Sequence, residues 1–192
     1  GDTAIALGNN TVIQGDVAIT GDDVELKGDV EGNILADDIS THASSSTTIT
    51  GSIFSSGTVS IGTGTVTGDI HAANGIILGS AQSSVPFGGW LFSNGNIELS
   101  GSSVVLGHVH TCGGDVETSG GAVIGTATEP IEVRASGNVS LSGGDVYGNV
   151  YAGGNIVVSG SARIVGNAYA GGTITAVNAT PTVPGHLLLR SP

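Results

Sequence analysis

The chain has 192 residues, which suits a single domain, and only 10% of them are charged. Its four fixed cations, Lys27, Arg134, Arg163 and Arg190, leave a net charge of −12, which argues against binding to nucleic acid or to an anionic membrane surface. No apolar run reaches the ~18 residues of a membrane span, and the 34 glycines among many β-branched residues favour strands and tight turns over helices.

The first 40 residues are the acidic part of the chain, because they hold nine of its sixteen carboxylates. Stacked acidic turns can bind Ca²⁺, but the calcium-binding nonapeptide repeat with GGxGxD is absent. We therefore favour solvated turn acids over a Ca²⁺ site, expect no cofactor, and expect one acidic end of the molecule. The nine are Asp2, Asp16, Asp22, Asp23, Glu25, Asp29, Glu31, Asp37 and Asp38.

A four-residue phrase, Gly-polar-apolar-x, recurs along the chain, and several successive copies follow one another at a nearly constant spacing. The longer gap from Gly107 to Gly148 leaves room for two coils with a small bulge. The copy at Gly28 falls between Gly15 and Gly51, which lie two periods apart, so it is expected to open a second face rather than a new coil. The copies begin at Gly15, Gly28, Gly51, Gly68, Gly89, Gly107, Gly148 and Gly166.

The third residue of the phrase is apolar and should point inward, so the fourth should point outward. In six copies the fourth residue is an aromatic or imidazole ring, and equivalent residues of neighbouring coils lie one above another. The sequence thus predicts an exposed column of rings, which either stabilises the solenoid or serves as a binding or assembly face. Its residues are Phe54, His71, Phe92, His110, Tyr151 and Tyr169.

Three stretches interrupt the rhythm. Residues 40–49 are expected to lie on a face or bulge out, residues 79–89 to form a loop that leads to Trp90, and residues 125–132 to turn a corner at Pro130. A single cysteine, Cys112, excludes an internal disulfide. We expect it to be a buried small hydrophobe, with pairing between chains as the alternative.

The clearest repeat is an adjacent pair, GNVYAGGNIVVSGSARIV at 148–165 and GNAYAGGTITAVNATPTV at 166–183. Within the first unit, four apolar side chains can all point inward between glycine-rich corners. They are Val150, Ile156, Val158 and Ile164. About six residues per face and three faces per turn describe a triangular coil.

The predicted fold is all-β: a single parallel three-faced β-solenoid over residues 1–192, with coils of about 18 residues, about ten coils in all and a right-handed winding. A sandwich of hairpins is the alternative, but it does not explain a phrase that returns once per coil. Residues 181–192 carry Leu187, Leu188 and Leu189 beyond the last full coil. This run is predicted to cap the last coil or to dock on another subunit.

The segment GNVYAGGNIVVSGSARIVGNAYAGGTI resembles bactofilins, bacterial polymer-forming β-solenoids, and related repeats of surface- and pilus-associated proteins. The resemblance is best over residues 137–177 and looser over 12–125. It implies self-assembly into filaments without nucleotide, by end-to-end stacking of coils, and it carries no catalytic residues. The greater length and the scarcity of Lys and Glu depart from cytoskeletal bactofilins and favour an extracellular or cell-surface structure.

Catalysis is not expected, because the cations are scattered and no nucleophile is paired with a base in a supported order. No metal site is expected either, since His71 and His110 stand two coils, ~10 Å, apart. The expected function is a non-enzymatic, self-assembling subunit of an extracellular filament, sheath or pilus-type structure, with another copy as partner. The alternative is a surface binding module, either a glycan-binding adhesin or an ice-binding protein. The ice-binding alternative rests on Thr-x-Thr strings that begin at Thr48, Thr65, Thr126 and Thr173.

Overall fold

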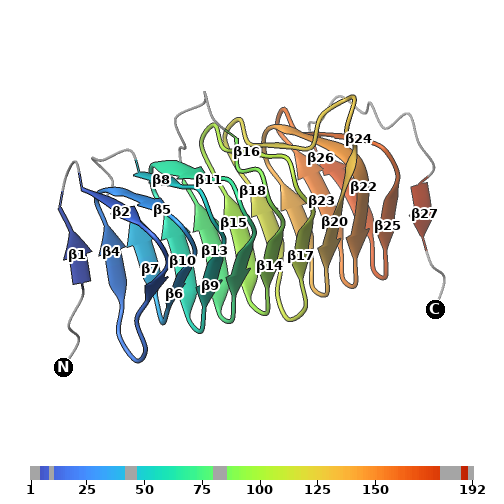
Figure 1. The fold of residues 1–192 in the computed structure, drawn as a ribbon. Helices are drawn as coiled ribbons and strands as arrows, with labels where there is room; N and C mark the ends of the chain where they lie inside the picture. Colours follow the sequence, from blue (N-terminus) through green and yellow to red (C-terminus); the bar gives the residue numbers. More distant parts are fainter. Residues whose placement is uncertain (1–4, 9–10, 42–46, 80–85, 178–186, 190–192) are drawn as a thin grey trace.

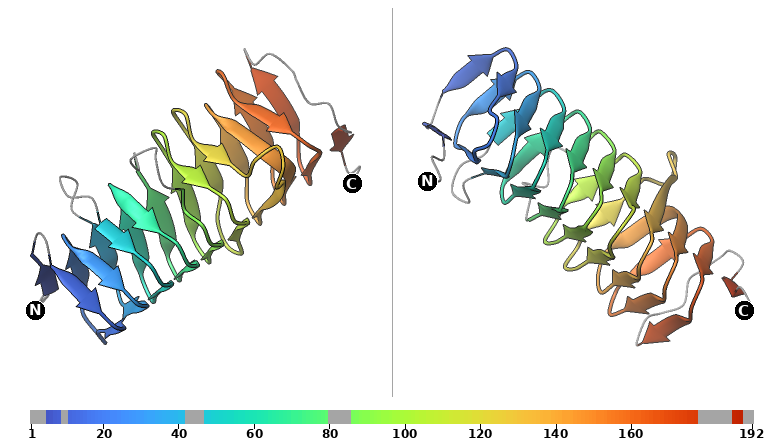
Figure 2. Two further views of the ribbon diagram at one scale, coloured as in Figure 1. Left: turned by 45° about the horizontal axis from the view of Figure 1, so that its top comes forward. Right: turned by 90° about the horizontal axis from the view of Figure 1, so that it is seen from below.

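The computed structural model describes residues 5–8, 11–41, 47–79, 86–177 and 187–189, and every regular element in these ranges is a β-strand. The chain winds along one axis as a rod of stacked coils, with β1 at one end and β27 at the other (Figures 1 and 2). It makes about nine turns of about 18 residues, which corresponds to about 40 Å at ~4.8 Å per coil. The predicted all-β parallel β-solenoid with three sheets is confirmed.

The first sheet has ten parallel strands, one from each successive coil, and forms one complete side of the rod. Because one strand follows the next at the spacing of a coil, equivalent residues lie in rows along the axis. Its strands are β1 (Ile5–Leu7), β4 (Val24–Leu26), β7 (Ile39–Thr41), β10 (Thr58–Ile61), β13 (Gly75–Leu78), β15 (Asn96–Leu99), β18 (Val116–Thr118), β21 (Val139–Leu141), β23 (Ile156–Ser159) and β26 (Ile174–Val177).

The second sheet carries the phrase found in the sequence, and it also runs the length of the rod. β27 pairs in parallel with β25, so the backbone of the leucine run continues this sheet by one strand. The strands are β3 (Val17–Ala18), β6 (Ile34–Ala36), β9 (Ile53–Ser55), β12 (Ile70–Ala72), β14 (Leu91–Ser93), β17 (Val109–Thr111), β20 (Ile131–Ala135), the second half of β22 (Asp145–Ala152), β25 (Ala168–Ala170) and β27 (Leu187–Leu189).

The third sheet is interrupted near the middle of the rod, where Phe87 forms an isolated parallel bridge with Val105. On the N-terminal side of Phe87 it consists of β2 (Val12–Gln14), β5 (Asp29–Glu31), β8 (Thr47–Ile49) and β11 (Gly64–Val66). On the other side it consists of β16 (Val104–Val105), β19 (Val123–Ile124), the first half of β22 and β24 (Arg163–Val165). Strand β22 continues around the corner and so belongs to two sheets. The expectation that Gly28 opens a second face is confirmed, since β5 lies in this sheet.

The coil length varies, and the variation explains where the sequence pattern was incomplete. The step between register partners on the second sheet is short from Val17 to Ile34 and long from Val109 to Val133. The coil at Gly32-Asn33-Ile34-Leu35 has the full phrase but was missed. The long gap from Gly107 to Gly148 holds two coils, as predicted, and the second of them starts at Ile131 instead of a glycine. A turn closes before it, with the Thr126 N–H bonded to the Glu129 carbonyl at 3.1 Å.

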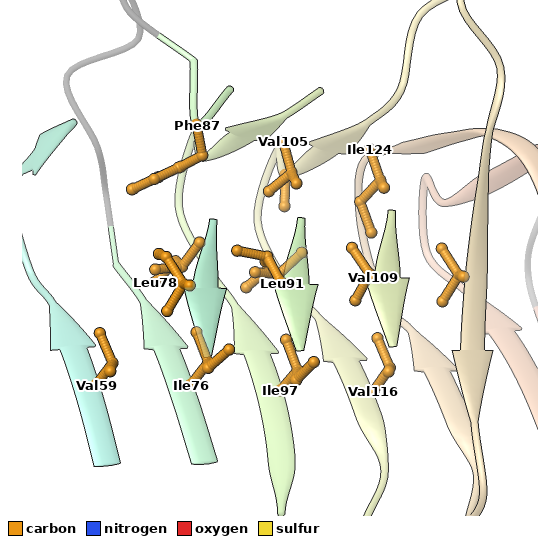
Figure 3. Packing of buried hydrophobic residues seen from close by; sticks show 14 of the residues in the cluster. Val59, Ile76, Leu78, Phe87, Leu91, Ile97, Val105, Val109, Val116 and Ile124 are labelled. Atoms are coloured by element: carbon orange, nitrogen blue, oxygen red, sulfur yellow. The ribbon is translucent and has the colours of Figure 1, made fainter. Parts of the chain in front are cut away.

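The core is a set of apolar rows enclosed by the three sheets (Figure 3). The third residue of the phrase is fully buried in coil after coil, as predicted, for example Ile53, Leu91 and Val109. The four inward residues predicted within one repeat unit are confirmed too: Val150, Ile156, Val158 and Ile164 are all buried. Because each row continues through neighbouring coils, an apolar side chain packs above and below on its counterparts, and no coil encloses a core alone.

Polar side chains at two corners also bond each coil to the next. The carboxylate of Asp16 accepts the backbone N–H of Asn33 at 2.7 Å, and the Asn33 amide oxygen accepts the N–H of Ser52 at 2.9 Å. Ser52, Asp69, His108 and Asn149 continue this corner in the same way. At the second corner the acceptors are Asp23, Asp38, Asn96, Asp115, Asn138 and Asn155. Several of the N-terminal acids therefore act as inter-coil acceptors in addition to being turn residues.

Candidate interaction surface

The six predicted ring residues lie on the outward face of the second sheet, and the strand register brings them into one column. Phe54 pairs with His71, His71 with Phe92, and Phe92 with His110. Tyr151 pairs with Tyr169 at the other end. We call this column, completed by the residues described next, the ring ladder.

Two further members of the ring ladder, Arg134 and Leu35, are not among the six ring residues predicted from the sequence. Arg134 fills the gap, because it pairs with His110 on one side and Tyr151 on the other. Leu35 extends the ladder before Phe54. Leu35 could have been found, because its coil carries the full phrase. Arg134 was hidden because its coil has lost the initial glycine, although the alternation Ile131-Glu132-Val133-Arg134 preserves the inward–outward order.

The rings of the ladder contact one another rather than standing apart. Phe54 and His71 are stacked with centroids 5.2 Å apart and planes 15° apart. His71 and Phe92 are tilted by 37° at 5.7 Å, and Phe92 meets His110 edge to face at 5.2 Å. Where rings stack, their faces are covered by ladder neighbours, so the solvent meets mainly ring edges.

The C-terminal half of the ladder is a three-layer sandwich. The guanidinium carbon of Arg134 lies 4.2 Å from the centroid of the Tyr151 ring, and Tyr169 stacks on Tyr151 at 4.8 Å with planes 6° apart. The Glu132 carboxylate accepts a hydrogen bond from Arg134 Nε at 2.9 Å. This bond raises the pKa of Arg134 above its ordinary value, and the guanidinium over the tyrosine ring is an attractive cation–π contact.

A second pair of rings lies beside the ladder, at the second position of the phrase. Trp90 meets His108 edge to face, with centroids 4.6 Å apart. His108 in turn accepts the backbone N–H of Glu132 on Nδ1 at 2.9 Å, which requires the tautomer with its proton on Nε2. Trp90 remains 57% exposed. The outward face of the second sheet therefore carries aromatic side chains in two neighbouring columns, the ring ladder and the Trp90–His108 pair.

Two shallow hollows open along the ladder. One of about 370 Å³ is lined by Leu35, Phe54, His71 and Phe92 among others. The other, of about 410 Å³, is lined by residues that include His110, Cys112, Arg134 and Tyr151. Both are open depressions on the sheet rather than enclosed cavities.

The expectation that Cys112 is buried is wrong. Its side chain is exposed, and Sγ lies 3.8 Å from Nε2 of His110. The reason is its place in the coil: Cys112 follows the inward-facing Thr111 at the end of β17, so it points outward at the corner, two residues beyond the ring ladder.

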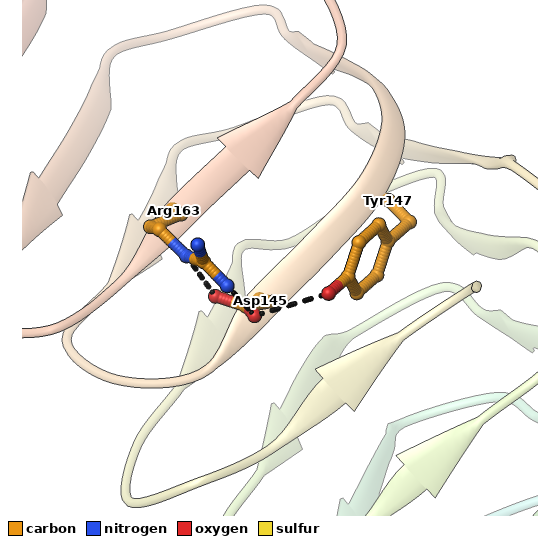
Figure 4. Close-up of polar contacts among 3 residues, drawn as sticks. All are labelled: Asp145, Tyr147 and Arg163. Carbon is orange, nitrogen blue, oxygen red and sulfur yellow. Dashed lines mark hydrogen bonds and ion pairs between the residues drawn. The ribbon is translucent and has the colours of Figure 1, made fainter. Parts of the chain in front are cut away.

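The third sheet holds a polar cluster built on an ion pair between neighbouring coils (Figure 4). Nε of Arg163 donates to the Asp145 carboxylate at 2.8 Å, and the Tyr147 hydroxyl approaches the same carboxylate at 3.4 Å. The Arg163 hydrogen bond is the main reason that the pKa of Asp145 lies below its ordinary value, and partial burial opposes the shift. Because Asp145 and Arg163 are register partners, this ion pair links two coils.

The remaining candidate positions are scattered. Within the described residues, no three or more His, Cys, Asp or Glu side chains form a group that could hold a metal ion. The Thr-x-Thr strings at Thr48 and Thr65 are in register on the third sheet, but the one at Thr126 lies in a turn and that at Thr173 runs into β26. The leucine run has its backbone placed by β27, and its role in subunit docking stays a prediction; residues 181–186 and 190–192 lie outside the described ranges.

These features define the class of protein: a parallel β-solenoid with three sheets and a ring ladder on one of them. Comparison of the chain with protein-family models, with curated proteins and with solved structures finds no match in any of the three. The similarity of the repeat to bactofilins is therefore a resemblance in pattern, and no family is assigned. In the part of the chain that the structure describes, no helix is long and apolar enough to cross a membrane.

Proposed function

We propose that the chain is a non-enzymatic, self-assembling subunit of an extracellular filament, sheath or pilus-type surface structure, and that its partner is another copy of itself. The observation that carries this proposal is the ring ladder, an outward-facing stripe along the rod whose members are half-buried or exposed. Among the described residues, six large hydrophobic side chains stay exposed, and three of them, Leu35, Phe54 and Trp90, lie on the outward face of the second sheet. Exposed apolar stripes of this kind mark protein contact surfaces.

The repetition of the stripe suits assembly. Every coil presents an equivalent side chain at nearly the same height on the sheet, so a contact with another long surface can be repeated coil by coil. Many weak, equivalent contacts add up to a strong one when they are held on rigid elements. The scarcity of Lys and Glu and the abundance of Ser, Thr and Gly support a location outside the cell or on its surface.

The test is to image the purified protein by negative-stain electron microscopy over a range of concentrations, with two variants beside it. Phe54→Ser removes a ring from the ladder, and Ile77→Ser is the matched control, because Ile77 is 40% exposed on the first sheet. Ordered filaments or sheets from the wild type and Ile77→Ser, and fewer from Phe54→Ser, are expected. Dispersed rods at every concentration would contradict the proposal.

A glycan-binding adhesin is the second candidate, and the hollow that includes His110, Arg134 and Tyr151 favours it. The exposed guanidinium of Arg134 could donate hydrogen bonds to an acidic sugar. Stacking of a sugar on the tyrosine faces is disfavoured, because Arg134 and Tyr169 lie against those of Tyr151. Glycan arrays probed with wild type and Arg134→Ala separate the two candidates, since only the adhesin predicts a hit that the variant loses.

A further inference from the structure

The part of the ring ladder from Phe54 to Tyr169, which leaves out Leu35, is centred on His110. These residues span seven consecutive coils, and His110 is the fourth member, with three ladder residues on either side. Among the described residues, the outward positions of the second sheet in these coils hold three fixed charges, Asp69, Glu132 and Arg134. These outward positions therefore carry a net charge of −1 out of the total of −12, so two copies that meet through the ladder face repel each other little.

From this arrangement we infer that two copies pair through their ring ladders as antiparallel rods, with strand β17 on the two-fold axis. The inference rests on the proposed self-association and specifies its contact. A two-fold interface is self-complementary: a residue a given number of coils before the centre meets the residue equally far beyond it. His110 would then face His110 of the second copy, and the three residues on each side would pair across the interface.

The pairs that this geometry creates are chemically compatible. Phe92 meets Arg134 of the second copy, a cation against an aromatic ring. His71 meets Tyr151, which can share a hydrogen bond, and Phe54 meets Tyr169. In the adjacent column, Trp90 would face Glu132 of the second copy, so its indole N–H would meet an acceptor. Like charges do not meet along either column.

Parallel rods are the alternative, and the charge of Arg134 argues against them. In that arrangement every ladder residue faces its own copy, so two permanently charged guanidinium groups would be held against each other at one contact. Like charges directly opposed across an interface destabilise it. The antiparallel arrangement avoids this contact and replaces it with two Arg134–Phe92 contacts.

The position of Cys112 provides a built-in reporter. It lies two residues beyond His110, just past the end of β17, and its side chain is exposed. With β17 along the two-fold axis, Cys112 of one copy faces Cys112 of the other. In the parallel arrangement Cys112 would face His108 instead, with the two sulfur atoms on opposite edges of the interface, ~13 Å apart along the strand direction.

The small area buried between the two ring ladders makes the pairing concentration-dependent. Seven coils at ~4.8 Å and a strand width of ~15 Å give about 500 Å² per copy, or about 1,000 Å² in total. This lies near the lower limit of about 1,000 Å² for specific interfaces. The dimer is therefore expected to form in the micromolar range and to be reinforced in a larger assembly.

The test uses charge at Phe92, with dimerisation measured by sedimentation and thermal melting as a check on folding. Phe92→Glu and Phe92→Lys lose the same ring contacts, so they differ only in the sign of the charge opposite Arg134 of the second copy. In the antiparallel dimer Phe92→Glu should keep the dissociation constant within about threefold, whereas Phe92→Lys should raise it about tenfold or more. In a parallel dimer residue 92 lies opposite residue 92 of the second copy, so Phe92→Glu and Phe92→Lys each place two like charges together. Both variants should then weaken dimerisation equally, and that result would overturn the inference.

Cross-linking gives an independent readout. A short bismaleimide should join two wild-type chains through Cys112 at concentrations where the dimer forms. Cys112→Ser combined with Ser60→Cys moves the thiol to the first sheet and should give no dimer. Filaments could form without a Cys112 cross-link and without a difference between the Phe92 variants. That result would support the proposed function but contradict the antiparallel interface. Absence of any self-association would remove both.

Discussion

At the scale of single residues, His108 shows how one side chain holds two coils in register. Its Nδ1 accepts the backbone N–H of Glu132 at a corner, just ahead of the first register pair between β17 and β20. Other coils place Asp, Asn or Ser at the equivalent position, with the same bond to the next coil. The requirement is therefore an acceptor of suitable reach, and the imidazole is one of several solutions.

This requirement gives a prediction for His108. Replacement by Asn keeps an acceptor of the type used by Asn33 and Asn149, so the free energy of unfolding should change by less than about 1 kcal/mol. Replacement by Ala leaves the Glu132 N–H unpaired and should lower the free energy of unfolding by about 1–3 kcal/mol. Urea unfolding of the two variants measures the difference. Equal losses would mean that the ring contact with Trp90, which both variants lose, matters more than the acceptor.

The Asp145–Arg163 pair gives a prediction about pH. Because the Arg163 hydrogen bond lowers the pKa of Asp145 in the folded state, the ionised carboxylate stabilises the fold above its unfolded pKa of about 3.9. That contribution is lost as the pH falls through the lower folded pKa. Asp145→Asn should therefore melt below the wild type at pH 7, and the two melting curves should converge towards pH 2. Glu98→Gln, an exposed change on the first sheet, is the control and should show no such convergence.

Single residues also determine how much of the ring ladder can be predicted from the sequence alone. Six ladder residues were found because outward direction follows from alternation, and alternation is visible without a structure. Arg134 does not stand out in the sequence because its coil lacks the glycine that opens the phrase, although its alternation is intact. Cys112 was misplaced because small, apolar side chains are often buried, whereas its place after Thr111 puts it at an outward corner.

At the scale of strands and corners, the glycine that opens the phrase is required by crowding between coils. A Cβ atom on Gly107 would overlap the carbonyl oxygen of Gly89 in the coil below, and one on Gly166 would overlap that of Gly148. The backbones approach closely at this corner because a tight turn follows directly into a strand of the second sheet. Glycine therefore recurs here for lack of space, even in coils where its φ angle is ordinary.

Gly107→Ala should accordingly lower the free energy of unfolding by about 1–3 kcal/mol, the range for an added methyl group without room. Gly121→Ala is the matched control, because the nearest atom to its Cβ, the Gly101 oxygen, is 3.6 Å away. That variant should be neutral or up to about 1 kcal/mol more stable, since alanine restricts the unfolded chain. Chemical denaturation separates the two, and a harmless Gly107→Ala would show that the corner can open.

At the scale of the whole molecule, the fold class was predictable and the irregularities were not. A phrase that returns once per coil with inward apolar positions leaves few alternatives to stacked coils. The interruption of the third sheet at Phe87 and the long coil that ends at Val133 depend on which turn absorbs extra residues. Turn insertions on a solenoid change no inward row, so the periodic pattern does not report them.

The same architecture predicts how the molecule should fail. In a solenoid each coil is stabilised mainly by its neighbours, so damage should spread from the injured coil to the nearer end rather than through the whole chain. Ile156 is fully buried on β23, the last strand but one of the first sheet, close to the C-terminal end. Ile156→Asp places an unpaired charge in the core, which the fold cannot compensate.

Hydrogen exchange measured by mass spectrometry should then show loss of protection in β21 to β26 while β4 to β13 stay protected. Val157→Asp, one residue along the same strand and pointing outward, is the control and should leave both regions protected. The boundary of the exchanging region would show how many coils unfold as one unit. A coil stays folded only if the free energy gained at its interface with the next coil exceeds the entropy cost of ordering its own residues. Loss of protection along the entire rod would instead mean that all coils fold as one cooperative unit, and near-normal protection would contradict the inward position of Ile156.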